Sequence, residues 1–280
     1  MNSARVSIIC PYRNASPFLG NLIANVQAQR LSNWELLLVN DGSQDDGPAL
    51  VARAASSDSR LRPLEARNRP PGAAKGPWWP RNQGLSHATA PWVTFLDADD
   101  LWHPHKLDLQ LALHEKESLD LSVTGYGRFR SSDEQLVGWR CPPATLPYRS
   151  LLQSNVLPLL TLMVRRELLS NGFPACVHED YLCWLNLFQL HPQLRYGHLP
   201  DLLGFYRLHS GNLTGRRWTM AHWTFQVYRR HGLGPLASAL GLVPWLWHQG
   251  RASWWCLKQP LMGALQPALW AEPPWRLPPT

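Results

Sequence analysis

The sequence lacks the cysteine pattern of a disulfide framework or of a zinc site. Its five cysteines are odd in number, form no Cys-x-x-Cys pair and stand mostly in apolar segments such as IICPY and YLCWL. Disulfides persist in oxidising compartments, where they staple small folds. A chain of 280 residues can bury a hydrophobic core without them. We therefore expect a reduced, cytoplasmic protein.

The sequence also lacks a recognisable targeting or membrane-spanning segment. The first residues, MNSARVSIIC, have neither the basic start nor the long apolar stretch of a signal peptide. A run without charged side chains extends from Gly232 to Gly250, but prolines and glycines interrupt it. Since a spanning helix needs ~20 consecutive apolar residues, we expect this run to pack on the protein or to lie at a membrane surface.

Acidic residues are nearly missing from the last part of the chain. Residues 216–280 contain seven lysines and arginines, eight of the fifteen tryptophans and a single acid, Glu272. Basic charge beside amphipathic aromatic side chains is typical of a surface that contacts anionic lipids or an acidic partner. A helical appendage with a solvated basic face fits this composition equally well. No nucleic-acid recognition module is visible, so we expect no nucleic-acid partner.

Within this extension the spacing of apolar residues predicts a helix. Leu236, Leu240, Val243 and Trp247 fall on one helical face. Such a row is more often part of a core than a membrane contact. The arginines that flank it in the sequence favour peripheral contact with an anionic membrane, on its inner face.

The first 215 residues alternate between strand and helix patterns. Apolar runs rich in β-branched residues alternate with segments of helical spacing, and no internal repeat is visible. Successive strand-helix units predict an α/β fold with a mostly parallel sheet flanked by helices. Because the composition changes near Gly215, we expect a domain over 1–215 and a helical, Trp- and Arg-rich extension over 216–280. The expected strands are 6–10, 34–40 and 91–100, and the expected helices are 18–30, 48–57 and 81–89.

Polar side chains stand at the ends of the three predicted strands. These are Tyr12 to Asn14, Asn40 to Ser43 and Asp97 to Asp100. Ligands of open α/β sheets bind at the carboxyl ends of strands, so we expect the three groups to converge on one crevice.

The third group places three carboxylates in the segment FLDADDLW. Carboxylates this close repel one another, and a divalent cation such as Mg²⁺ or Mn²⁺ is an economical way to compensate them. In an extended chain Asp97 and Asp99 would point the same way and could address one ligand. Asp100 would point to the opposite face and cap the helix that follows.

Two other motifs carry side chains of interest. Glu179 and Asp180 open a predicted helix, where acids can simply complement the helix dipole. His209 follows a polar segment, and its imidazole is either a ligand for Mn²⁺ or a loop histidine without a ligand.

Four stretches of the sequence match a known family. They are VSIICPYRNASPFL, WELLLVNDGS, RNQGLSHATAPWVTFLDADDLWHPHKL, and HEDYLCWLNL followed by YRLHSGNLT. Through them the chain resembles the family 2 glycosyltransferases over residues 5–215, and the third stretch is the most specific. The resemblance implies a GT-A, Rossmann-like fold and a nucleotide-diphosphate sugar donor.

The resemblance also implies roles for single residues. Asp180 matches the general base, Asp99 the residue that touches the Mn²⁺ or Mg²⁺ ion, and His209 a further metal or diphosphate contact. Tyr12 stands one position earlier than the aromatic residue usual in the family, which leaves its stacking on the base open. The implied donor contacts are Pro11, Tyr12, Asn14, Asp41, Arg81 and Asp97, with Asp100, Glu179 and Arg207 in supporting positions. Among them Asp41 matches the residue that binds the nucleobase, and Asp97 the one that reaches the ribose or sugar.

The implied reaction is a single displacement that inverts the anomeric carbon. The sugar would pass from a donor, expected to be UDP-linked, to a hydroxyl of a glycan or lipid-linked acceptor in cell-surface polysaccharide synthesis. One alternative is a catalytically silent scaffold that binds nucleotide sugars, against which the intact set of acids argues. Another is a sugar-phosphate nucleotidyltransferase, but the Gly-rich phosphate loop expected after its first strand is absent.

Overall fold

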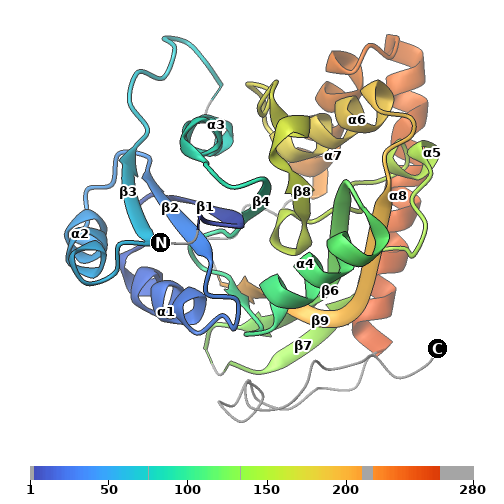
Figure 1. Cartoon of the computed structure of the whole chain (residues 1–280). Coiled ribbons are helices and arrows are strands. Elements are labelled where there is room, and N and C mark those ends of the chain that lie inside the picture. Colours follow the sequence, from blue (N-terminus) through green and yellow to red (C-terminus); the bar gives the residue numbers. More distant parts are fainter. Residues whose placement is uncertain (1–2, 75, 133, 210–216, 259–280) are drawn as a thin grey trace.

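The computed structural model describes residues 3–74, 76–132, 134–209 and 217–258. The described strands form one curled sheet in the order β3-β2-β1-β4-β8-β6-β9-β5, and β7 pairs with β6 (Figure 1). The strands are β1 (Val6–Tyr12), β2 (Trp34–Asn40), β3 (Leu61–Glu65), β4 (Trp92–Phe95), β5 (Leu101–Trp102), β6 (Leu121–Arg130), β7 (Leu136–Arg140), β8 (Met163–Arg165) and β9 (Tyr196–Leu208).

The helices lie around this sheet. The α-helices are α1 (Ser16–Gln27), α2 (Gly47–Ser57), α3 (Trp78–His87), α4 (Lys106–Glu117), α5 (Tyr148–Leu151), α6 (Glu179–Leu190), α7 (Arg217–Arg230) and α8 (Pro235–Lys258). Two short 3₁₀ helices are η1 (Leu159–Thr161) and η2 (Arg166–Leu169).

The first half of the sheet is parallel, as the strand-helix pattern predicts. β1 pairs in parallel with β2 and β4, and β2 pairs in parallel with β3. β1 continues two residues beyond the predicted end, through Pro11. A proline is tolerated there because pairing with β4 ends at Ile9, so β4 no longer needs the missing N–H. β3 was not predicted, since it is short and contains Pro63.

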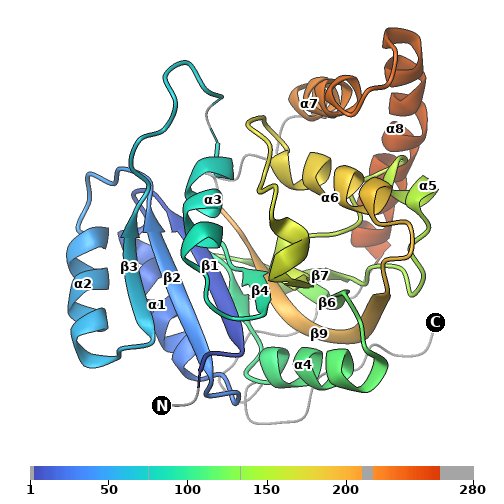
Figure 2. The ribbon, with the colours of Figure 1, turned by 45° about the horizontal axis from the view of Figure 1, so that its top comes forward.

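Successive side chains of β1 point to opposite faces of the sheet and pack in two separate hydrophobic cores. The strand is therefore apolar at nearly every position. Ile8 packs in a cluster with residues of α1 and α4, such as Leu22 and Leu111. Ile9 packs in a second cluster with residues of α3 and α6, such as Trp78. Figure 2 shows α1 and α4 on the face of the sheet opposite α3 and α6.

The second half of the sheet is mixed. β8 is antiparallel to both β4 and β6, while the long strands β6 and β9 run parallel to each other. β5 pairs antiparallel with the distal part of β9. This arrangement carries the end of β9, and therefore His209, back to the turn that follows β4.

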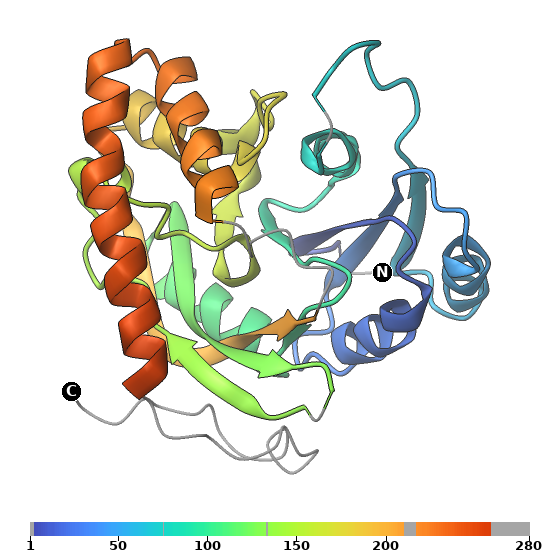
Figure 3. The same cartoon turned by 180° about the vertical axis from the view of Figure 1, so that it is seen from behind.

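The expected extension is helical over 217–258, where α7 and α8 lie side by side at the end of the molecule away from α2 (Figure 3). Val227 and Tyr228 of α7 are buried in the same cluster as α6. α8 approaches α7 closely, because a Cβ on Gly241 would lie 2.9 Å from the Tyr228 ring. The boundary expected near Gly215 lies outside the described residues. None of the described helices has the length and apolar character needed to cross a bilayer.

Candidate active site

The ends of β1, β2 and β4 meet at one edge of the sheet, as the sequence predicts. Tyr12 lies opposite Asn40 in the parallel register, and Ile9 lies opposite Phe95, the last residue of β4. The Asp41 amide donates a hydrogen bond of 2.9 Å to the Tyr12 carbonyl. Parallel strands therefore deliver all three polar groups to the same side of the molecule.

The loop after β1 is tied to the loop after β2. Asn14 has a left-handed backbone, with φ of 50°, a conformation that asparagine adopts more readily than most residues. Its amide donates to the Ser43 Oγ at 3.0 Å, and its Oδ1 accepts from the Gln44 amide at 2.8 Å. Pro11 lies within β1, and Tyr12 is buried in the core, with only 4% of its surface exposed. Their contact with a donor stays a prediction.

Asp41 is held by an arginine that the sequence gave no reason to single out. Arg69 Nη2 lies 2.9 Å from both Asp41 carboxylate oxygens and donates at 3.2 Å to the Gly76 carbonyl. Arg69 belongs to the proline-rich loop between β3 and α3. This ion pair anchors that loop beside the residue expected to bind the nucleobase.

The acidic group after β4 forms a turn, and the prediction of an extended chain through Asp100 was wrong. β4 ends at Phe95, and the Asp100 amide donates to the Asp97 carbonyl at 3.1 Å, closing a turn over four residues. The turn sends Asp97 and Asp99 to different neighbours. Asp97 pairs with Arg81, and Asp99 pairs with His209.

The helix-capping role expected for Asp100 was also wrong. The next helix begins only at Lys106, and Asp100 Oδ1 instead accepts from the Arg207 amide at 2.9 Å. Arg207 Nε donates to the Asp99 carbonyl at 2.7 Å, so β9 holds the acidic turn at two points. Burial raises the pKa of Asp100 well above its usual value, and the charges of Asp99 and Asp97 add to this effect.

Arg81 connects the acidic turn to the start of α6. Its Nη2 donates to Asp97 Oδ1 at 2.8 Å, and its Nη1 donates to Glu179 Oε1. The Arg81 and Glu179 side chains are each 5% exposed, whereas Asp97 is 43% exposed and remains open to a ligand. The buried Nε of Arg81 has no partner among the described residues.

Glu179 and Asp180 are the first two residues of α6, as predicted. Burial raises the pKa of Glu179 to about 7, while the charge of Arg81 acts in the opposite direction. Asp180 has a different partner, since its Oδ2 accepts from Asn155 Nδ2 at 2.9 Å. The sequence gave no signal for Asn155, which lies in a loop.

The residue before these acids contacts the C-terminal helices. His178 has a left-handed backbone, with φ of 54°, and its ring lies 5.3 Å from the Trp223 ring of α7 in an edge-to-face arrangement. Arg230 of α7 donates to the Ala175 carbonyl at 2.8 Å. α7 therefore holds the segment that leads into the Glu179–Asp180 pair.

Asp99 and His209 form the pair that could hold a metal ion. Asp99 Oδ2 and His209 Nε2 are 2.8 Å apart, and their side chains are about one quarter exposed, 24% and 25%. Across the described ranges no three His, Cys, Asp or Glu side chains form a complete metal site. Mg²⁺ and Mn²⁺ commonly take one or two protein ligands and complete their shell with substrate phosphates and water. The Asp99–His209 pair fits that incomplete donor set.

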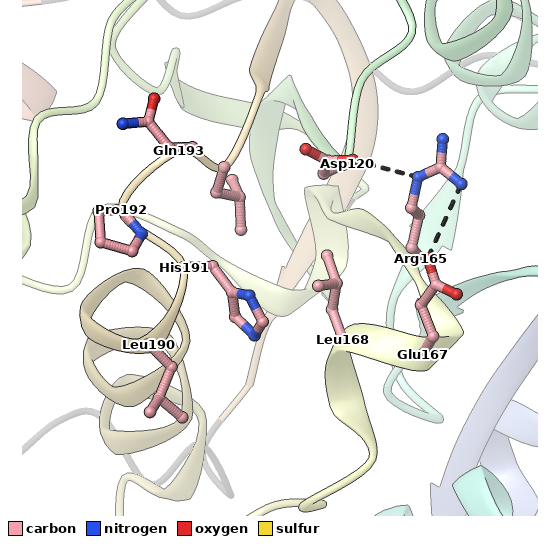
Figure 4. Close-up of a pocket in the computed structure, with 9 residues that line it drawn as sticks. Asp120, Arg165, Glu167, Leu168, Leu190, His191, Pro192 and Gln193 are labelled. Atoms are coloured by element: carbon pink, nitrogen blue, oxygen red, sulfur yellow. Dashed lines mark ion pairs between the residues drawn. The ribbon is translucent and has the colours of Figure 1, made fainter.

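A separate pocket lies away from these residues. Its volume is about 350 Å³ and it lies between the end of α6 and η2, where Asp120 pairs with Arg165 at 3.2 Å (Figure 4). None of the predicted site residues lines it.

The sequence comparisons identify the family. The model of "Glycosyl transferase family 2" matches residues 7–164, more than half of the chain. An uncharacterized glycosyltransferase of Haemophilus influenzae is 30% identical over 85% of this chain and 93% of its own length. UDP-Glc:alpha-D-GlcNAc-diphosphoundecaprenol beta-1,3-glucosyltransferase WfgD of Escherichia coli is 32% identical over 68% of this chain and 72% of its own length. The putative teichuronic acid biosynthesis glycosyltransferase TuaG of Bacillus subtilis is 29% identical over 80% of this chain and 87% of its own length.

Solved structures show the same fold. Staphylococcus aureus TarS 1-349 in complex with UDP-GlcNAc has a TM-score of 0.65 at 18% identity, over 95% of this chain and 78% of its own. The mannosyltransferase PcManGT of Pyrobaculum calidifontis, in complex with GDP-Man and Mn²⁺, has a TM-score of 0.61 at 19% identity. The match covers 90% of this chain and 76% of the PcManGT chain. The chain therefore belongs to the family 2 glycosyltransferases and has the GT-A fold.

Proposed function

We propose that this enzyme transfers a sugar from a UDP-sugar to a hydroxyl of a glycan or lipid-linked acceptor in cell-surface polysaccharide synthesis, with inversion at the anomeric carbon. The names of two relatives support these substrate classes. WfgD is named for UDP-glucose and a diphosphoundecaprenol-linked acceptor, and TuaG for teichuronic acid biosynthesis. The TarS complex with UDP-GlcNAc supports a UDP-linked donor.

The observation that carries the proposal is the position of Arg81. This buried guanidinium contacts Asp97 on the donor side and Glu179 beside the expected base, and its pKa is raised by the charges of Asp97, Glu179 and Asp180 against the effect of burial. One cation is therefore close to all three carboxylates. The two halves of the expected site, represented by Asp97 and Glu179, are 82 positions apart in sequence and belong to one electrostatic unit.

The side chains of this chain would divide the reaction between them. Asp41 and Asp97 would hold the nucleoside and sugar of the donor, with the charge of Asp41 balanced by Arg69 and that of Asp97 by Arg81. Asp180, oriented by Asn155, accepts the proton from the acceptor hydroxyl. The acceptor oxygen forms the new bond to the anomeric carbon while the bond to the diphosphate breaks, and the nucleoside diphosphate departs. Attack opposite the leaving group inverts the anomeric configuration.

Asp99 and His209 would hold the divalent cation. When bound, Mn²⁺ or Mg²⁺ would supply positive charge beside the diphosphate as it leaves. Arg207 supports this function indirectly, because its two hydrogen bonds hold the turn that carries Asp99. The Mn²⁺ in the PcManGT complex supports the choice of metal.

A lipid-linked acceptor requires the enzyme to work at a membrane. We propose that the enzyme lies on the cytoplasmic side and contacts the inner face of an anionic membrane through residues 216–280. The basic, acid-poor composition of that segment supports this contact.

A screen of nucleotide sugars tests the proposal. Purified enzyme is incubated with each donor and Mn²⁺, and release of the nucleoside diphosphate is measured with and without EDTA. We expect turnover with a UDP-sugar, its loss with EDTA, and a strong decrease in Asp99→Ala. Asp108→Ala is the matched control, because Asp108 lies on α4 and pairs with His105. Release by no donor, or equal release by Asp99→Ala, contradicts the proposal.

A further inference from the structure

The exposed surface of α8 is apolar throughout its described part. Side chains are described there from Pro235 to Leu246. Leu236 is 72% exposed, Leu240 60%, Val243 63% and Leu246 51%. The other exposed side chains of this stretch are proline and alanine. Their exposure argues against the alternative that the predicted row belongs to the core, and the Trp247 side chain lies outside the described residues.

The opposite face of α8 is the one that packs on the protein. Ser238 is fully buried, Trp245 is 4% exposed, and Leu242 packs against the main core beside α7. Gly241 allows the close approach to Tyr228. These positions recur at intervals of three and four, so they form one helical face. α8 is thus apolar on both faces, and only one of them has a partner among the described residues.

A helix that is apolar all round is ordinarily covered on all sides, by protein or by lipid. An exposed row of large aliphatic side chains is unusual on a monomeric protein and marks an interaction surface. We call Leu236, Leu240, Val243 and Leu246 the apolar row. We therefore expect this row to contact another surface when the enzyme works.

The charge near the apolar row indicates a bilayer. No acidic residue occurs between Leu202 and Ala271. Arg229 and Arg230 are exposed at the end of α7, just before the turn into α8, while Arg251 and Lys258 follow the row in sequence. Apolar side chains flanked by cations, without acids, suit an interface with anionic headgroups.

The two helices also connect this surface to the expected base. α7 holds the segment before Asp180 through the Arg230–Ala175 and Trp223–His178 contacts. α8 packs directly on α7. A membrane contact made by α8 would therefore be transmitted through one helix to the residue that meets the acceptor.

We propose that the apolar row of α8 inserts into the headgroup region of an anionic membrane and so presents the active site to a lipid-linked acceptor. The acceptor part of this inference rests on the proposed function, namely transfer to a lipid-linked acceptor; the binding of the apolar row to lipid does not depend on that reaction. The row would reach the boundary between headgroups and acyl chains, while Arg229 and Arg230 contact lipid phosphates.

Flotation with liposomes tests the inference on the full chain. Vesicles of phosphatidylglycerol and phosphatidylcholine are compared with vesicles of phosphatidylcholine alone. We expect the wild type to float with the anionic vesicles and to float much less with the neutral ones. The triple variant L236Q/L240Q/V243Q should remain at the bottom of the gradient. Arg229→Gln and Arg230→Gln should each weaken binding about fivefold, and added salt should weaken it further.

A matched control distinguishes binding through the apolar row from nonspecific binding through any exposed apolar side chain. Leu190 is 62% exposed but lies at the end of α6, so Leu190→Gln should float like the wild type. The triple variant should also retain donor hydrolysis and thermal stability, which keeps a failure of the proposed function distinct from a failure of this inference. A wild type that does not float overturns the inference, whether a second copy of the chain or residues 259–280 cover the row. Equal flotation of the triple variant overturns it as well.

Discussion

Arg81 of α3 and Glu179 of α6 form a buried ion pair across 98 residues of sequence. Each side chain is only 5% exposed, so neither charge can turn to solvent if the other is removed. Breaking a buried pair by removing one partner typically costs about 3–5 kcal/mol, because the remaining charge stays in a poorly solvated site. The pair therefore stabilises the packing of α3 against α6, in addition to belonging to the candidate site.

Replacing this arginine should destabilise the protein strongly. We expect Arg81→Met to lower the free energy of unfolding by about 3 kcal/mol or more, measured by urea denaturation at about pH 8.5, above the Glu179 pKa of about 7, so that both charges of the pair are present in the wild type. Arg5→Met is the matched control, since the Arg5 and Glu115 side chains of its pair are 43% and 58% exposed. An exposed pair contributes at most about 1 kcal/mol, so the control should change little. Similar stabilities of the two variants would refute a structural role for the buried pair.

The raised pKa of Glu179 predicts how stability depends on pH. Its value in the folded protein, about 7, lies above the usual 4.5. Between these two pH values the folded state holds a proton that the unfolded state has lost. The contribution of Glu179 is therefore complete below pH 4.5 and declines as the pH rises through 7.

We expect the wild type to lose stability relative to Glu179→Gln as the pH is raised from about 4.5 to about 7.5. Urea denaturation of both proteins at several pH values measures the difference. Parallel curves for the two proteins would show that the pKa of Glu179 is not raised in the folded state.

Asn155 should position Asp180 for proton transfer. Its amide donates to the carboxylate at 2.9 Å, so Asn155→Ala leaves Asp180 free to rotate. We expect kcat to fall about tenfold while the KM for the donor stays the same, because a small misplacement of a catalytic group is costly. Steady-state kinetics with varied donor distinguish this result from a loss of donor affinity. A raised donor KM with unchanged kcat would assign Asn155 to donor binding instead.

The Arg69–Asp41 pair should support nucleotide binding. Without Arg69, the proline-rich loop loses its anchor and Asp41 loses the group that orients it. We expect Arg69→Ala to weaken binding of UDP about tenfold in calorimetry, the size expected for a hydrogen bond to a charged group. Arg67→Ala removes an exposed arginine from the same loop and should have little effect. Equal affinities of the two variants would contradict this role.

The sequence predicted the fold where its signals were local. Continuous apolar runs marked β1 and β2, and the strand-helix alternation indicated the parallel half of the sheet. β3 was not predicted because Pro63 argues against a strand. A proline is tolerated there because β3 is an edge strand. The antiparallel return of β8 depends on long-range pairing, which no short segment encodes.

The sequence predicted where the acids of the candidate site lie but not which side chains they contact, and their roles in the reaction stay predictions. The motifs placed the three polar groups at one edge of the sheet, but Arg69 and Asn155 lie in loops whose course only the folded chain reveals. The turn at Asp97–Asp100 was missed because the strand was extrapolated beyond Phe95. Exposure of the apolar row on α8 could not be read from helical spacing, which is the same for a buried face.

The proposed function depends most directly on Asp180 as the general base. The decisive measurement compares UDP-sugar binding and transfer rate in the wild type and Asp180→Asn, which keeps the shape of the side chain. We expect donor affinity to be unchanged and kcat to fall by about 10²–10⁴-fold. Turnover of Asp180→Asn at the wild-type rate would contradict the account.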